Sequence, residues 1–286
     1  MGKWWNHRSR YRIAKRCGDT GQQTSEPQIL LRQLIHRDQR SRRVMTRALP
    51  QVCFFCGDAS ADPVCDPCTA AAPRLPAESC PRCQLASANG EVCGRCLKKP
   101  PQWQRLHARW RYDFPLDHAV LAAKYQHQFA LYRWAIGTLT AWPFDTATRV
   151  TVLPVPLAPE RLAERGYNQA TLIARELVCR FDATTGAPAL QIAADAVLRV
   201  RETAVQQRLN WVERRRNVRG AFAVTRAFDG EAVLLVDDVL TTGATLNELA
   251  RVLTVAGAAR VDALVLARVQ PIRRRERSNA FGRAVN

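Results

Sequence analysis

Beyond about residue 100, apolar residues follow two kinds of spacing along the chain. Short runs of consecutive apolar residues are typical of strands buried on both faces of a sheet, whereas apolar residues three and four apart are typical of amphipathic helices. The predicted strands cover residues 108–114, 148–156, 232–239 and 260–269, with shorter extended runs near 196–200 and 220–225. The predicted helices cover residues 116–126, 129–141, 167–181 and 244–256. This alternation predicts an α/β fold with a doubly wound, mainly parallel sheet.

The segment before residue 100 has a different character, because it is rich in cysteine. Eight of the ten cysteines form four C-x-x-C pairs, which are Cys53/Cys56, Cys65/Cys68, Cys80/Cys83 and Cys93/Cys96. Two such pairs supply the four thiolates of one tetrahedral metal site. A disulfide framework belongs to secreted chains, and no export signal is seen here; no βαβ pattern surrounds the pairs, as a redox motif would require. The pairs therefore predict two structural Zn²⁺ ions, with sequential and cross-braced pairing both open.

Three further residues near or outside the pairs have predicted roles. Gly57 and Gly94 each follow a cysteine, and glycine permits the tight turns that such sites use. Cys179 stands apart from the pairs, in the helical run "ATLIARELVCRF". We expect it to be a small buried residue rather than a metal ligand.

Composition divides the chain into three regions. The segment "KKPPQW" (98–103) has the charges and paired prolines of a linker, so a small zinc-binding domain is predicted over 46–100 and the α/β domain over 101–286. Residues 1–45 form a basic tail. An overextended start, with Met45 as the true first residue, is the favoured interpretation of the tail, and a disordered nucleic-acid arm is the alternative.

Net charge and hydropathy limit the partners. The formal charge is +18, and residues 1–44 hold 11 Lys/Arg and 3 acids, so the tail contributes +8 and the remainder +10. A basic body favours a polyanion such as nucleic acid, or phosphorylated ligands. The longest apolar region, 119–144, is interrupted by Lys124, His127 and Arg133, so no membrane insertion is predicted. We expect a cytoplasmic protein.

The chemistry is concentrated in "VLLVDDVLTTGAT", residues 233–245, in which a hydrophobic strand leads to Asp237 and Asp238 and then to a turn of small residues. Ligands of a doubly wound sheet bind at the carboxyl ends of its strands, where we expect this pair. Backbone N–H groups, hydroxyls and a helix dipole can bind a phosphate in the turn that follows, and two carboxylates can accept hydrogen bonds from a ribose diol. The predicted turn residues are Thr241, Thr242, Gly243, Ala244 and Thr245. The stretch predicts a site for a ribose 5-phosphate.

Two familiar nucleotide sites and a plain structural role fit this stretch less well. A P-loop ATPase also has a hydrophobic strand that ends in an acid, but the chain contains no G-x-x-x-x-G-K-[ST]. A Rossmann site would need G-x-G-x-x-G after a strand, which is absent too. A plain core strand followed by a capped helix would need neither the two acids nor the T-T-G-x-T turn.

These residues resemble a known motif. The stretch 233–245 is similar to the phosphoribosyl pyrophosphate (PRPP) motif of type I phosphoribosyltransferases. The segments "LPVPLAPERLAERGYNQA" (153–170) and "RVRETAVQQRLNWVERRRNVRGAF" (199–222), downstream of a multi-cysteine module, resemble the ComF family of competence-associated, phosphoribosyltransferase-like proteins. The resemblance covers about residues 50–270. It implies that Asp237 and Asp238 hold the ribose hydroxyls, that 241–245 hold the 5-phosphate, and that Mg²⁺ accompanies PRPP.

Two arginine-rich segments complete the candidate site. Arg161 and Arg165 are four apart, so on a helix they share a face that suits a pyrophosphate; an ordinary surface with Glu160 and Glu164 as partners is the open alternative. The segment 199–222 resembles the hood that closes over pyrophosphate in type I phosphoribosyltransferases, although a basic groove for nucleic acid would have the same composition. In the ComF pattern the recurrent polar positions are Arg201, Thr203, Gln206, Arg214 and Asn217.

Two functions remain open at the level of sequence. One is a pentosyltransferase that uses PRPP and Mg²⁺ to transfer phosphoribose to a nitrogen nucleophile. The other is a non-catalytic factor in DNA uptake that binds single-stranded DNA and competence proteins, with PRPP or a nucleotide as effector. The positive charge favours the second modestly. The sequence leaves catalysis undecided.

Overall fold

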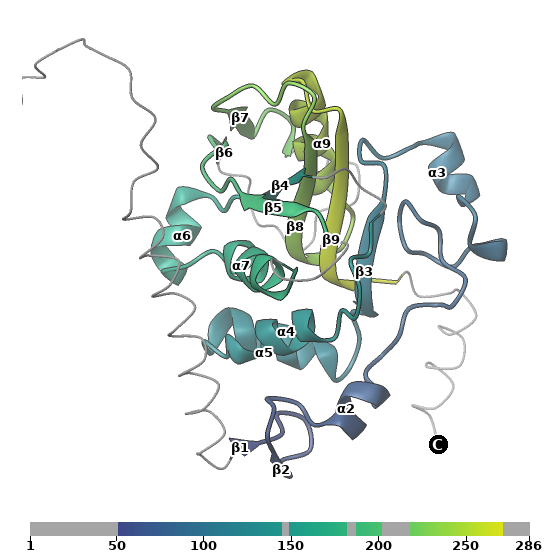
Figure 1. Ribbon diagram of the computed structural model, residues 1–286, viewed down its shortest axis with the longest axis vertical. Helices are drawn as coiled ribbons and strands as arrows, with labels where there is room; N and C mark the ends of the chain where they lie inside the picture. Colours follow the sequence, from purple (N-terminus) through teal and green to yellow (C-terminus); the bar gives the residue numbers. More distant parts are fainter. Residues whose placement is uncertain (1–50, 145–148, 182–186, 202–217, 271–286) are drawn as a thin grey trace, which may run out of the picture. The chain divides into compact units, whose positions relative to one another are not determined.

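The computed structural model describes residues 51–144, 149–181, 187–201 and 218–270, which are coloured in Figure 1. All of them belong to one compact unit, Pro50–Asn286. The predicted basic tail, 1–45, lies outside the described residues, so both interpretations of it stay predictions. The predicted boundary near residue 100 likewise remains a prediction.

A five-stranded parallel sheet forms the centre of the fold. Its strand order is β3-β9-β8-β4-β5, and each neighbouring pair is parallel. The strands are β3 (Leu106–Arg111), β4 (Arg149–Pro154), β5 (Ala189–Ile192), β8 (Ala232–Leu240) and β9 (Arg260–Arg268). The predicted doubly wound, mainly parallel sheet is confirmed. Its central strands are continuous apolar runs because helices cover both faces.

Alternation along β8 shows how the two faces are filled. Leu234 and Val236 belong to a core that includes residues of α4, α5 and α7, whereas Val233 and Leu235 belong to a core that includes α9. Successive side chains of a strand point to opposite faces, so one strand contributes to both cores. The helices are α4 (Leu116–Tyr125), α5 (Ala130–Gly137), α6 (Pro159–Arg165), α7 (Gln169–Phe181) and α9 (Ala244–Val255). Figure 1 shows α4, α5 and α7 grouped together, separate from α9.

The short edge strand β5 was not predicted from the sequence, and neither was the pairing of the two predicted extended runs near 196–200 and 220–225. The edge strand β5 has only four residues and alternates exposed with half-buried positions, so it lacks the long apolar run of the central strands. The extended runs near 196–200 and 220–225 become β6 (Val197–Arg199) and β7 (Phe222–Val224), and these pair antiparallel as a separate two-stranded sheet. The second sheet packs in the same core as α9.

The cysteine-rich segment has little regular structure. It contains β1 (Gln51–Val52), β2 (Ala59–Ser60), α2 (Asp66–Ala71), the 3₁₀ helix η1 (Ala88–Gly90) and α3 (Gly94–Lys98). Within the described residues, no helix has the length and apolar character needed to cross a membrane.

The expectation for Cys179 was wrong, because its side chain is exposed. The buried stripe of α7 consists of Ala170, Ile173, Ala174, Leu177 and Phe181. Cys179 lies two residues after Leu177, which places it off the stripe, since neighbours on a helix face are three or four residues apart.

Candidate functional site

The acidic pair lies within β8 rather than after it, because the strand continues to Leu240. Pairing with β4 stops at Pro154 opposite Val236, while pairing with β9 continues to Arg268 opposite Leu240. Asp237 and Asp238 therefore lie beyond the end of β4, on a part of β8 that pairs only with β9. Each aspartate also binds the next residue: Asp238 N–H donates to Asp237 Oδ1 at 2.9 Å, and Val239 N–H donates to Asp238 Oδ1 at 2.7 Å.

The two carboxylates have different surroundings, because neighbours in a strand point to opposite faces. Asp238 is 3% exposed and forms an ion pair with Lys124, whose Nζ lies 2.5 Å from Asp238 Oδ2. Lys124 comes from α4, which covers that face of the sheet. Burial, the largest single influence, lowers the pKa of Lys124, but the charge and hydrogen bond of Asp238 together with the charge of Asp237 outweigh it, and the pKa is raised overall. A charged lysine thus lies against Asp238, one of the two carboxylates that are predicted to bind the ribose hydroxyls.

Asp237 is half-buried, and its pKa is raised to about 8. Burial is the largest cause, the negative charge of Asp238 adds to it, and the positive charge of Lys124 opposes it. Near neutral pH the pair therefore carries less than two full negative charges. This follows from the general cost of ionising two adjacent carboxyls in a partly buried place.

The predicted phosphate turn leads directly into α9. Gly243 is the N-cap of this helix and has φ 78°, ψ 10°, a left-handed conformation that favours glycine. No side chain caps the helix, so the first-turn N–H groups are not taken up by a capping oxygen. Thr242 Oγ1 accepts only a long contact, 3.4 Å, from Ala244 N–H. Uncapped N–H groups, threonine hydroxyls and the helix dipole together suit an anion.

The eight paired cysteines form two tetrads in sequential pairing. The ligand atoms of each tetrad lie within 4.8 Å of one another, so each tetrad could hold a metal ion. The first tetrad is Cys53, Cys56, Cys65 and Cys68, and the second is Cys80, Cys83, Cys93 and Cys96. Of the two pairing schemes left open by the sequence, the structure has the sequential one.

The geometry of the tetrads fits zinc. Tetrahedral Zn–S bonds of about 2.3 Å place neighbouring sulfurs about 3.8 Å apart. Cys56 Sγ lies 3.8 Å from Cys65 Sγ, and Cys83 Sγ lies 3.6 Å from Cys93 Sγ. Burial acts to raise the pKa of Cys53, but backbone N–H donors outweigh it and the pKa falls to about 6.

The two tetrads have nearly the same knuckle turn. Gly57 N–H donates to Cys53 O at 2.9 Å, and Gln84 N–H donates to Cys80 O at 2.8 Å. Gly57 has φ 79°, as expected, but the second knuckle uses Gln84 with φ 56°. Gly94 was expected to form a tight turn and instead begins α3.

Comparison with known proteins places the chain in a family. The family model described as "Phosphoribosyl transferase domain" matches residues 162–282. The "DNA utilization protein YhgH" of Escherichia coli O6:H1 is 35% identical over 217 residues, which span 72% of this chain and 90% of that protein. The "Competence protein F" of Haemophilus influenzae is 34% identical over 186 residues (62% and 78%), and the "Competence protein ComFC" of Streptococcus pneumoniae is 25% identical over 207 residues (72% and 87%). The chain belongs to the ComF family.

The predicted pyrophosphate arginines of this ComF-family chain lie on a short helix. α6 contains both Arg161 and Arg165, and Gly166 ends the helix with φ 77°. Arg165 Nη1 donates to Gln169 Oε1 at 2.7 Å, and its guanidinium lies over the ring of Tyr125, 5.3 Å from the centroid. Arg165 therefore contacts the end of α4, next to Lys124, which brings it toward the acidic pair.

Tyr167 holds Arg165 and its helix close to α4. Its hydroxyl lies 2.9 Å from Ala123 O and 2.7 Å from Lys124 O, so it caps the carbonyls at the end of α4. Its ring packs edge-on against Phe129, with centroids 4.7 Å apart. The run "GYNQ" after α6 thus holds the turn between α6 and α7 against the helix that carries Lys124.

The predicted hood is described only at its two ends. Residues 202–217, with Thr203, Gln206, Arg214 and Asn217, lie outside the described residues. Arg201 Nη2 donates to Arg219 O at 2.7 Å, which ties the two ends together. Gly220 N–H donates to Glu248 Oε1 at 2.9 Å, and this carboxylate also binds Arg251, so the hood end is attached to α9.

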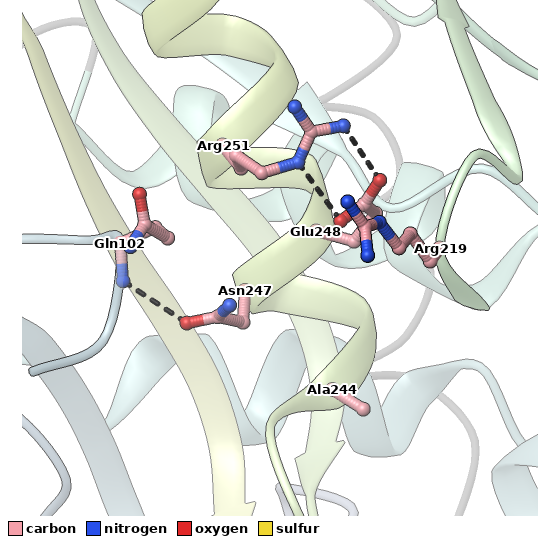
Figure 2. A pocket seen from close by; sticks show the side chains of 6 residues that line it. All are labelled: Gln102, Arg219, Ala244, Asn247, Glu248 and Arg251. Atoms are coloured by element: carbon pink, nitrogen blue, oxygen red, sulfur yellow. Dashed lines mark hydrogen bonds and ion pairs between the residues drawn. The ribbon is translucent and has the colours of Figure 1, made fainter. Parts of the chain in front are cut away.

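Two cavities border the first turn of α9. One, of about 320 Å³, is lined by Arg219 and Arg251 among others, and Figure 2 shows both arginines beside Glu248. The other, of about 520 Å³, lies between the second tetrad and the phosphate turn. Asn247 lines both, and its Oδ1 accepts a 3.0 Å hydrogen bond from the backbone N–H of Gln102 (Figure 2).

Sequence reasoning missed Lys124 and Tyr167 as members of the site. In the sequence, Lys124 stands out only as an interruption of an apolar region, although a lysine within an otherwise apolar helical segment is a signal for a buried charge with a partner. Tyr167 lies inside the motif that carries the family resemblance, but its contact with α4 is made across 44 residues of sequence and has no local signature.

Proposed function

We propose that this ComF-family chain binds PRPP, or a nucleotide that carries a ribose 5-phosphate, across the carboxyl end of β8 and the start of α9. The observation that carries the proposal is the junction itself. An acidic pair with a buried lysine partner is followed, after two intervening residues, by an uncapped turn whose glycine adopts a left-handed conformation. Few other ligands need diol acceptors next to a phosphate cradle.

The proposed roles follow position by position. Asp237 and Asp238 accept hydrogen bonds from the ribose hydroxyls, and residues 241–245 bind the 5-phosphate. Arg161 and Arg165 bind the pyrophosphate, with Mg²⁺ neutralising part of its charge. Arg201, at the hood end, is a further cation of this set. Lys124 is added to it, because its ion pair with Asp238 keeps it charged beside the acidic pair.

Catalysis is the second element of the proposal. If a nitrogen nucleophile enters beside bound PRPP, it displaces pyrophosphate at the anomeric carbon, and the protein supplies orientation and charge rather than a covalent intermediate. The alternative is that the same site senses PRPP or a nucleotide without turnover. The names of the relatives refer to DNA utilization and to competence, and they favour a role in DNA uptake with single-stranded DNA and competence proteins as partners.

We also propose that each tetrad holds one structural Zn²⁺. Four thiolates leave no open coordination position, so the ions would have no direct part in the chemistry. Zinc-binding cysteines must stay reduced, and this requirement favours a reducing compartment such as the cytoplasm.

Titration calorimetry with PRPP and Mg²⁺ tests the ribose-phosphate site. The natural sequence is compared with the Asp237→Asn/Asp238→Asn double variant, which removes two charge-assisted acceptors and should weaken binding at least about 10-fold. Glu231→Gln is the matched control, because Glu231 immediately precedes β8 and pairs with Arg226. Its affinity should equal that of the natural sequence.

Two results would contradict the proposal, and a third would decide between its two forms. Absence of PRPP binding by the natural sequence would refute PRPP as the ligand, and a parallel titration with nucleoside monophosphates would test the nucleotide form. Full affinity in the double variant would refute the assigned residues. Binding of PRPP without release of pyrophosphate from it, whichever nitrogen nucleophile is added, would favour the sensing role over the transferase role.

A further inference from the structure

The turn that carries the first two cysteines of the second tetrad, residues 80–84, is called the second knuckle. Four consecutive backbone carbonyls of this knuckle accept hydrogen bonds from the α/β domain. Pro81 O accepts from Leu106 N–H at 2.9 Å, and Arg82 O accepts from Trp103 Nε1 at 2.8 Å. Cys83 O accepts from Arg268 Nε at 3.0 Å, and Gln84 O accepts from Gln270 Nε2 at 2.8 Å. The direction in which each of these carbonyls points depends on the tight turn of the knuckle. This turn contains Cys80 and Cys83, the first two cysteines of the second tetrad.

One of the four donors, Arg268, reaches the start of the phosphate turn. It is the last residue of β9, is 5% exposed, and its Nη1 donates to Leu240 O at 3.0 Å and to Thr241 O at 2.6 Å. The same guanidinium therefore binds the knuckle on one side and the end of β8 on the other. Its planar, rigid fork fixes the two backbone segments relative to each other.

A second donor, Trp103, lies against the middle of the turn. A Cβ placed on Gly243 would come within 2.9 Å of its ring atom Cη2, so the indole is in contact with the turn backbone. The indole N–H is the group that binds Arg82 O. The cavity of about 520 Å³ also lies between the knuckle and the turn, which leaves Arg268 and Trp103 as side chains that bridge the space.

The first tetrad has different neighbours. Thr69, which follows Cys68, accepts a 2.9 Å hydrogen bond at Oγ1 from Trp134 Nε1, and the ring of Phe55 lies edge-on to the same indole. Trp134 belongs to α5, which covers the sheet face opposite to α9. These contacts connect the first tetrad to a helix that carries no phosphate-turn residue.

We propose that Arg268 is a positioning residue that, together with Trp103, makes the shape of the phosphate turn depend on metal held by the second tetrad and not by the first. The proposal rests on the proposed function only for its affinity readout. When metal leaves the second tetrad, the knuckle carbonyls lose their fixed directions. Arg268 Nε and Trp103 Nε1 then lack their acceptors, and the turn backbone at 240–243 loses its support from one side.

A matched pair of cysteine variants tests this dependence. Cys65→Ser and Cys93→Ser change equivalent positions, because each residue is the third cysteine of its tetrad and donates its N–H, at 3.4 Å, to the first cysteine sulfur. Each should lose one zinc ion per full-length chain. Cys93→Ser should weaken PRPP binding about 5-fold or more, whereas Cys65→Ser should leave it unchanged.

Hydrogen exchange provides a readout that does not need PRPP. In Cys93→Ser, the amides of 240–247 should exchange faster than in the natural sequence, while the amides of β4 should keep their protection and so report an intact sheet. In Cys65→Ser the amides of 240–247 should be unaffected. Equal changes in both variants, or no change at 240–247 in either, would overturn the proposal.

Arg268→Lys tests whether the arginine is the link. Lysine keeps the positive charge but cannot bind knuckle and turn at once with a rigid fork. The variant should retain two zinc ions and show faster exchange at 240–247. Combined with Cys93→Ser, it should add little further effect, because both changes interrupt the same connection. Fully additive effects would show that Arg268 acts independently of the metal, contrary to the proposal.

If the natural sequence fails to bind PRPP, the proposed function fails, and the exchange results alone still decide the role of Arg268.

Discussion

At the scale of single residues, Gly243 has two independent reasons to be glycine. Its φ of 78° is costly for any other residue, and a Cβ would lie 2.9 Å from Trp103 Cη2, closer than side chains normally approach. The sequence motif indicated the first reason. The second arises from a tryptophan far away in the chain.

Gly243→Ala should therefore affect both stability and ligand binding. We expect the free energy of unfolding to fall by about 1–2 kcal/mol from the backbone strain, and phosphate-turn binding to weaken because Trp103 or the turn must shift. Denaturant titration and PRPP calorimetry measure the two effects. Gly137→Ala is a suitable control, since a Cβ there meets nothing within 4 Å and the φ is ordinary. A Gly243→Ala variant with unchanged stability would show that the turn relaxes freely.

The raised pKa of Asp237 gives a pH dependence with a definite sign. Below about pH 8 the free protein holds a proton on Asp237, and a ribose diol needs the deprotonated acceptor. PRPP affinity should therefore rise as the pH increases from about 6.5 to 9 and level off above the pKa, with proton release on binding at neutral pH. Calorimetry in two buffers of different ionisation enthalpy measures the release. In Asp237→Asn the rise should disappear, and a rise that persists would assign it to another group.

At the scale of elements, the ion pair of Lys124 with Asp238 joins α4 to β8. Both side chains are largely removed from solvent, with 19% and 4% exposed. Truncating one partner of such a pair leaves a buried charge without compensation, whereas removing both does not. The pair thus makes the position of α4 dependent on the same carboxylate that is proposed to bind ribose.

Lys124→Met should lower the free energy of unfolding by about 3 kcal/mol. Asp238→Asn should lower it too, but the double variant Lys124→Met/Asp238→Asn should recover part of the loss, since neither charge is then left alone. Urea titrations of the four proteins give the coupling. A coupling near zero would show that solvent reaches the pair and screens it. Loss of PRPP binding in Lys124→Met with retained fold would in addition support a direct role for Lys124.

At the scale of the whole molecule, the two tetrads attach the cysteine-rich segment to different parts of the α/β domain. The first contacts α5 through Trp134, and the second contacts β3, β9 and the linker through its knuckle carbonyls. Metal binding at such sites contributes directly to folding, because an unfolded chain has no preformed site.

Zinc removal should consequently lower the Tm of the full-length chain. The purified protein should contain two zinc ions by elemental analysis. Chelation should lower the Tm by several degrees, and zinc added back should restore it. Cys65→Ser and Cys93→Ser should each retain one ion. A metal-free chain with an unchanged Tm would contradict a structural role for the tetrads.

The sequence by itself determined the elements and motifs that depend on neighbours along the chain. Continuous apolar runs predicted the central strands, the C-x-x-C spacing predicted two metal sites, and the order of strand, acids and small turn residues predicted the start of α9. These signals are local because strand burial, knuckle turns and helix starts are each set within about ten residues. The short edge strand β5 and the exposure of Cys179 were not predicted, since both depend on where a face lies relative to the sheet.

Only the tertiary structure decided which distant groups meet. The sequential pairing of the tetrads, the burial of Asp238 against Lys124, and the contact of Tyr167 with the end of α4 join residues separated by long stretches of chain. The same holds for Arg268, which lies next to Cys83 although 185 residues separate them. The physical reason is that ion pairs and hydrogen bonds between elements depend on the order of strands in the sheet and on which helix covers each face. Neither of these is encoded in the spacing of residues within one element.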